Sequence, residues 1–162
     1  MRRTRRNHAI EHATVHLLTA RRPCNVAARA DSGGFYLYGD VDTAELRAAV
    51  IEAIARLKTE PGLAVHPRCG TNLVVGGLLA GLASLAAVLS ASAEEQRAGP
   101  WSLLPRLLLA GTAAAVVSQP AGPWVQRRLV TRPDVAGVRV AAVTVQERGR
   151  HRLHRVELTD GE

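Results

Sequence analysis

The sequence has 162 residues, of which 47% are apolar but only 3% aromatic, and its formal net charge is +7. Its two cysteines, Cys24 and Cys69, are too few for a disulfide-stapled secreted scaffold. Only one of the 21 basic residues, Lys58, is a lysine. So much arginine beside so much alanine indicates that the base composition of the genome favours these two residues. The arginine content alone is therefore poor evidence for nucleic-acid binding.

The first 70 residues predict a small mixed α and β segment. A helix is expected where Ile10, Ala13 and Leu17 recur at helical spacing. Asp42, followed three residues later by Glu45, predicts a capping box at the start of a second helix. The elements expected here are a helix over 4–20, strands over 25–30 and 35–38, a second helix that starts at the Asp42 cap and is stopped by Pro61-Gly62, and a short strand over 63–65.

Two uncharged stretches follow, and they predict a transmembrane hairpin. Residues 70–93 contain no charged side chain, and about 20 apolar residues suffice to cross a hydrocarbon layer. Residues 107–126 are also uncharged, with Pro120 and Pro123 near the end. We expect transmembrane helices at about 71–92 and 103–125. The alternative is a buried helical hairpin of a soluble protein.

The distribution of basic residues predicts the orientation of this hairpin. Residues 1–70 hold 11 Lys and Arg, the part after 126 holds 8, and residues 94–106 hold two. Cytoplasmic segments carry the excess of positive charge. The expected protein therefore spans the membrane twice, with both termini in the cytoplasm.

The end of the chain predicts a β-hairpin with strands over 138–146 and 151–158, turning at 148–150. His151 and His154, which alternate with arginines, are expected on a solvated face. The strands are expected to join those of the N-terminal segment in one sheet. The predicted fold is thus α+β, with a cytoplasmic α+β segment over 1–70, a transmembrane hairpin over 71–125 and a cytoplasmic β-hairpin tail over 126–162.

The sharpest chemical signal is the segment His8-Ala-Ile-Glu11-His12. At 100° per residue, His8, Glu11 and His12 share one face of the expected helix. Two imidazoles one turn apart can bind one zinc ion, and a neighbouring carboxylate can take a proton from metal-bound water. The spacing is that of the inverted zinc-peptidase motif H-x-x-E-H. The alternative is a polar helix face with a salt bridge.

A second segment, His66-Pro-Arg-Cys69-Gly, offers an imidazole and a thiol in a rigid turn just before the first apolar stretch. This pair is compatible with metal ligation. Alternatively, the turn only shapes the entry into the membrane, with Arg68 at the lipid headgroups and Cys69 as a small apolar filler.

The two histidine motifs, the segment GGFYLYGDV and the apolar hairpin together resemble a family of small, uncharacterised bacterial membrane proteins. The similarity extends over nearly the whole chain. A larger uncharacterised membrane-protein family is similar in the two histidine motifs only, and there a lysine commonly stands where this chain has Ala13. The resemblance implies a bacterial inner-membrane protein. It also implies that the functional positions lie among six residues: His8, Glu11, His12, His66, Arg68 and Cys69.

The number of metal ligands separates two functions. If His8, His12, His66 and Cys69 all bind one zinc ion, the tetrahedron is closed and the site is structural. The protein would then be a non-catalytic scaffold for a partner complex. If water occupies the fourth position, Glu11 is the general base of a zinc-dependent hydrolase of amides or esters. A cysteine ligand is unusual in zinc peptidases and favours the closed site, or no metal at all.

The remaining signals concern partners. The basic ends of the chain, at 2–6 and 127–132, predict contacts with anionic membrane lipids. Gly77 and Gly81 allow close helix packing, either within the hairpin or in a homo-oligomer. No recognition motif for nucleic acid accompanies the arginines, so a nucleic-acid partner is not expected.

Overall fold

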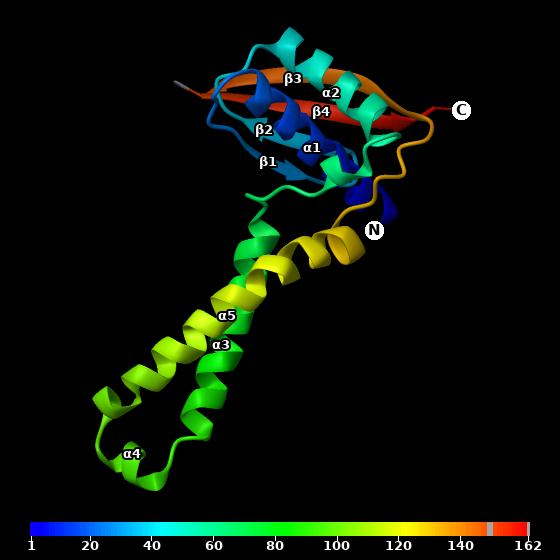
Figure 1. Cartoon of the computed structure of the whole chain (residues 1–162). Coiled ribbons are helices and arrows are strands. Elements are labelled where there is room, and N and C mark those ends of the chain that lie inside the picture. The colour runs from blue at the N-terminus through cyan, green and yellow to red at the C-terminus, as the bar shows by residue number, and fades with distance from the viewer. Residues whose placement is uncertain (149–150, 162) are drawn as a thin grey trace. The chain divides into compact units, whose positions relative to one another are not determined.

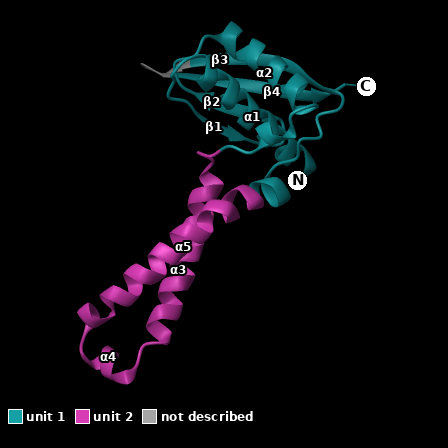
Figure 2. Ribbon diagram, in the orientation of Figure 1, with its two compact units in different colours: residues 1–66, 126–162 teal, residues 67–125 magenta. Residues whose placement is uncertain are grey.

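The computed structural model describes residues 1–148 and 151–161, and the chain divides into two compact units (Figure 2). Unit 1 combines both ends of the chain, residues 1–66 and 126–162. Unit 2 consists of residues 67–125. Within the described residues the fold is α+β, with five α-helices and a four-stranded sheet. The expected fold class is thereby confirmed.

Unit 1 is an antiparallel sheet with two helices on one face (Figure 1). The strands lie in the order β1-β2-β4-β3, and β2 pairs with β4, so the C-terminal hairpin joins the N-terminal strands as expected. The elements are α1 (Arg2–Arg21), β1 (Ala27–Ala30), β2 (Gly34–Tyr38), α2 (Thr43–Leu57), a 3₁₀ turn η1 (Pro61–Ala64), a π-helical turn η3 (Gln126–Val130), β3 (Val138–Arg148) and β4 (His151–Asp160). Residues 149–150 of the expected turn lie outside the described part.

The core of unit 1 lies between the sheet and its two helices. Alternate residues of β2 and β4 point toward the helices, and Phe35 stands opposite Val156 in the register. Ile10 of α1 and Leu46 of α2 cover them, and all four side chains are fully buried. Both helices therefore use one apolar stripe, as their spacing predicts.

Two local predictions in unit 1 need correction. The expected strand over 63–65 is wrong, because Leu63 N–H donates to Glu60 and Val65 N–H donates to Gly62, which closes η1. The capping box of α2 is only half formed. The Asp42 carboxylate accepts from the N–H groups of Ala44 and Glu45 at 2.8 and 3.0 Å, as predicted. The Glu45 carboxylate instead accepts from Arg22 at 3.2 Å.

Unit 2 is a helical hairpin whose two long helices, α3 (Gly70–Leu89) and α5 (Leu104–Val125), pack against each other. Two short elements connect them, α4 (Ala93–Arg97) and a 3₁₀ turn η2 (Pro100–Leu103). The helices are close to the predicted 71–92 and 103–125. The first ends earlier because Ser92 caps α4 in a complete capping box with Glu95.

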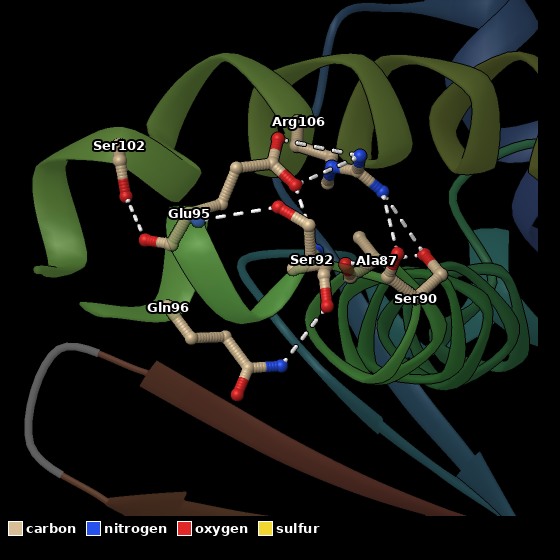
Figure 3. A network of polar contacts seen from close by, with 8 residues as sticks. Ala87, Ser90, Ser92, Glu95, Gln96, Ser102 and Arg106 are labelled. Carbon is tan, nitrogen blue, oxygen red and sulfur yellow. Dashed lines mark hydrogen bonds and ion pairs between the residues drawn. The ribbon is translucent and has the colours of Figure 1, made fainter. Parts of the chain in front are cut away.

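A polar network holds the connection between the two long helices together (Figure 3). Arg106, at the start of α5, donates to the Glu95 carboxylate at 3.3 Å and to the Ser90 carbonyl at 3.2 Å. The Ser102 hydroxyl donates to the Glu95 carbonyl at 2.6 Å. Arg106, the one charged residue within the bounds of α3 and α5, is therefore paired with Glu95 at the turn of the hairpin.

By length and composition, α3 and the stretch Pro100–Val130 are able to cross a membrane, with mean hydropathies of 2.1 and 1.4. Their apolar side chains are mostly exposed; Leu73, for example, is 80% exposed and Leu109 72%. This exposure distinguishes the hairpin from a core helix of a soluble protein, whose apolar side chains would be covered.

Candidate metal centre

Four histidines gather in unit 1 where α1 passes the segment that follows η1. His8, His12 and His16 stand one helical turn apart on α1, and His66 comes from the facing segment. The ring centroids of His8 and His12 are 4.3 Å apart, those of His12 and His66 5.7 Å, and those of His16 and His66 4.4 Å. The predicted convergence of His8, His12 and His66 is thus present in the fold.

Hydrogen bonds from α1 fix the segment that carries His66. His12 Nδ1 lies 2.8 Å from the Ala64 carbonyl, and His16 Nε2 lies 3.0 Å from the Val65 carbonyl. A carbonyl oxygen only accepts hydrogen bonds, so each of these ring nitrogens carries the proton. Two consecutive carbonyls are thereby bound to two consecutive turns of α1. His16 uses its Nε2 for this bond and acts as a positioning residue.

Gln126 holds the same segment from the other side. Its side-chain carbonyl accepts from the His66 N–H at 2.9 Å, and its amide donates to the His66 carbonyl at 3.1 Å. The residue is fully buried. Sequence reasoning missed it because a glutamine at the end of an apolar stretch gives no sign of its partner 60 residues earlier.

The proton on Nδ1 of His12 determines what its other nitrogen can do. In this tautomer Nε2 has a free lone pair, and it is buried without a hydrogen-bond partner among the described residues. A buried polar atom without a partner is uncommon and needs an explanation. Burial lowers the pKa of His12, against smaller opposing effects from the Ala64 carbonyl and Glu11. A neutral imidazole held by a carbonyl through Nδ1 is the form that binds a metal through Nε2.

Glu11 is buried as well, only 6% exposed, although the helix pattern allowed a solvated polar face. Burial raises its pKa to about 7, while His12 and the Ala30 N–H act in the opposite direction. Its Oε2 has no hydrogen-bond partner, and it forms no ion pair within the described part of the chain. These contacts of Glu11 give no support to the alternative of a polar helix face with a salt bridge.

Cys69 is the residue before α3, in unit 2, and its thiol lies 3.4 Å from the Thr71 hydroxyl. It follows His66 by three residues, so chain geometry alone keeps the two Cα atoms within about 11 Å. His8 and His12 of unit 1 and Cys69 of unit 2 all carry side chains that bind metal ions, and Cys69 stays a predicted ligand. Arg68 lies between the two motif residues, and nothing in the structure assigns it a role in metal binding.

One other expectation, for a titratable residue, changes with the structure. His154 is fully buried beneath α2, with Nε2 at 3.2 Å from the Thr43 hydroxyl, so the solvated face expected for it is wrong. The basic N-terminus is engaged within unit 1. Arg3 and Arg6 pair with Asp160, and Arg5 donates to the Arg128 carbonyl at 2.7 Å.

The comparisons with known proteins agree with the implied resemblance at the level of the family. An uncharacterized protein of Picosynechococcus sp. (strain ATCC 27264 / PCC 7002 / PR-6) is 39% identical over 142 residues, which cover 78% of this chain. The chain spans 65% of the length of that relative. No solved structure matches this chain. The model of a domain of unknown function, DUF6391, matches residues 3–143, and the chain therefore belongs to this family.

Proposed function

We propose that this protein is a membrane-anchored, metal-binding protein without catalytic activity. In this proposal, His8, His12, His66 and Cys69 hold one zinc ion at the cytoplasmic surface of a bacterial inner membrane. The hairpin is the anchor, and both termini lie in the cytoplasm. The metal stiffens unit 1 where the chain leaves it, and the unit is presented to a partner complex or to a second copy of the chain.

The observation that carries the proposal is the state of His12. Its Nδ1 is bound to the Ala64 carbonyl, and its Nε2 is buried, unprotonated and without a partner in the described residues. The rings of His8 and His66 flank the His12 ring, with distances of 4.3 and 5.7 Å between ring centroids. A divalent ion bound to Nε2 would give the orphaned lone pair a partner and explain why three imidazoles crowd together.

The donor set supports zinc and a closed site. Imidazole nitrogen and thiolate sulfur are the ligands that zinc prefers, and four of them complete its tetrahedron. A complete tetrahedron leaves no position for a substrate or a reactive water. Binding would also couple to stability, because α1 and the 66–69 segment would then be joined through one ion.

The anchoring role rests on the exposed apolar surface of unit 2 and on its charge pattern. The long helices expose residues such as Leu73 and Leu109. The first of them, α3, contains no charged residue between Gly70 and Leu89. The excess of Lys and Arg before residue 70 and after residue 126 supports the cytoplasmic placement of unit 1.

The proposal is tested by measuring bound metal in the full chain, purified in detergent and loaded with zinc. We expect about one zinc per chain, and losses of about tenfold or more in affinity for His12→Ala and Cys69→Ser. The matched control is His16→Gln, which keeps a donor for the Val65 carbonyl and should retain the metal. Unaltered metal content in Cys69→Ser would reject the closed four-ligand site, and absence of metal from the wild type would reject the proposal.

Glu11→Gln separates the closed site from the hydrolase. With a closed site, this variant keeps its zinc, and neither protein turns over peptides or esters. If the wild type hydrolyses such substrates and Glu11→Gln keeps zinc but loses turnover, Glu11 is the general base and the non-catalytic assignment is wrong.

A further inference from the structure

Away from the histidines, unit 1 has a groove between α2 and the strand β3. Its volume is about 200 Å³. One wall consists of Arg47, Ile51 and Ile54, which recur along one face of α2, and the other of Val138, Arg139 and Val140. Ile51 is 53% exposed although it is aliphatic. The groove therefore has an apolar floor and an arginine on each side.

The strand beside this groove is an edge of the sheet. β3 pairs with β4 on one side only, because the strand order is β1-β2-β4-β3. An edge strand presents N–H and C=O groups that can pair with a further strand. The register shifts between Val140 and Ala142, which marks a bulge. The bulge limits regular pairing at the groove to a short segment.

Among the residues that the structure describes, the arginines of the groove have no acidic partner. The acidic residues of α2 already have partners, since Glu45 pairs with Arg22 and Glu52 with both Arg21 and Arg56. Arg47 and Arg139 form no ion pair within the described ranges. No acidic side chain lines the groove.

We propose that this groove binds a short extended peptide segment of a partner protein, in which aliphatic side chains alternate with carboxylates. The volume is below the roughly 300–1,000 Å³ of small-molecule sites, so the groove suits the side chains of a peptide. The backbone of the segment adds to the edge of β3, an aliphatic side chain enters between Ile51 and Val140, and the carboxylates meet Arg47 and Arg139.

The probe for this test is a fluorescein-labelled seven-residue peptide in which glutamate alternates with valine, titrated into the full chain in detergent and followed by anisotropy. The double variant Arg47→Glu/Arg139→Glu should weaken binding by about tenfold, the combined effect of two exposed charge pairs. The matched control is Arg29→Glu, at the opposite edge of the same sheet, which should bind like the wild type. A peptide alternating lysine and valine should not bind.

Hydrogen exchange with the glutamate peptide bound gives an independent readout. We expect new protection in the amides of residues 138–146 and none in 27–30. Protection at β1 instead of β3, no binding at about 1 mM peptide, or equal binding by the double variant would overturn the proposal. If the double variant fails to fold, judged by its circular dichroism, Arg47→Gln/Arg139→Gln decides between the outcomes.

Discussion

Unit 1 and unit 2 are built from the same aliphatic residues but treat them in opposite ways. In unit 1, Ile10 and Leu46 are fully buried. In unit 2, Leu73 and Leu89 are 80% and 73% exposed. The difference lies in the pattern of the helices. α1 and α2 bury apolar residues against a sheet, whereas α3 carries no charged residue on any side and packs mainly against α5. Two such helices are unable to cover each other, and their surface suits an apolar surrounding.

The largest expected effect tests the buried side of this comparison. Phe35→Ala should lower the free energy of unfolding of unit 1 by about 3–5 kcal/mol, because it leaves a cavity opposite Val156. Tyr38→Ala, on the same strand but 47% exposed, is the control and should cost about 1 kcal/mol or less. The measurement is urea dependence of hydrogen exchange in the amides of β4. Equal losses for both variants would mean that the sheet does not shield a core.

The exposed side is tested by a matched pair of arginine substitutions. Leu82 in the middle of α3 is 56% exposed and Ile51 on α2 is 53% exposed. If lipid surrounds the hairpin, Leu82→Arg should cost about 2.5–3.5 kcal/mol of membrane insertion, whereas Ile51→Arg should leave insertion unchanged. The readout is the fraction of protein that stays in the membrane pellet after alkaline extraction. Identical retention of the two variants would show that the hairpin is not embedded in lipid.

The smallest expected effect is a change in how the stability of unit 1 depends on pH. It is confined to this unit because all six histidines lie there. Burial, helped by Arg152, lowers the pKa of His154, against a smaller opposing effect of Asp42. At this residue the unfolded chain then binds more protons below pH ~6.5, so the contribution of His154 to stability falls on acidification, by at most about 1.4 kcal/mol per pH unit. His12 shifts in the same direction. The raised pKa of Glu11 acts in the opposite direction over the same range.

Relative to the wild type, His154→Gln should therefore make the stability of unit 1 change less unfavourably as the pH falls from about 6.5 to 5.5. Urea titrations at several pH values measure it. The helical signal of the hairpin, which has no histidine, is the internal control and should not change. An unaltered pH dependence in His154→Gln would mean that this buried imidazole titrates as it does in the unfolded chain.

Patterns confined to one segment predicted this molecule well. The stripe of Ile10, Ala13 and Leu17 and the cap at Asp42 gave two helices, because helix signals depend on near neighbours. The expected strand at 63–65 failed because three residues carry too little periodicity to outweigh the local bonds that Pro61 initiates. Sequence alternation also placed His154 in solvent, because alternation gives two faces but not which of them the helices cover.

The histidines of the candidate site and their convergence were predictable, but the contacts that hold them in place were not. The motif spacing put His8, Glu11 and His12 on one helix, but their burial depends on elements far away in the chain. Which carbonyl fixes the His12 tautomer, and that Gln126 would hold His66, follow from tertiary contacts that no local pattern encodes. The groove beside β3 was missed for the same reason, since its two walls come from α2 and from a strand beyond the hairpin.

The pair of hydrogen bonds between Gln126 and His66 has one more consequence. They hold side by side the two points where the chain leaves and re-enters unit 1. The hairpin of unit 2 is therefore an insertion into the chain of unit 1, and the two residues that flank the insertion are bonded to each other within unit 1. Its length could therefore drift or be exchanged for another hairpin during evolution, because β3 would still arrive beside β4 from the same place.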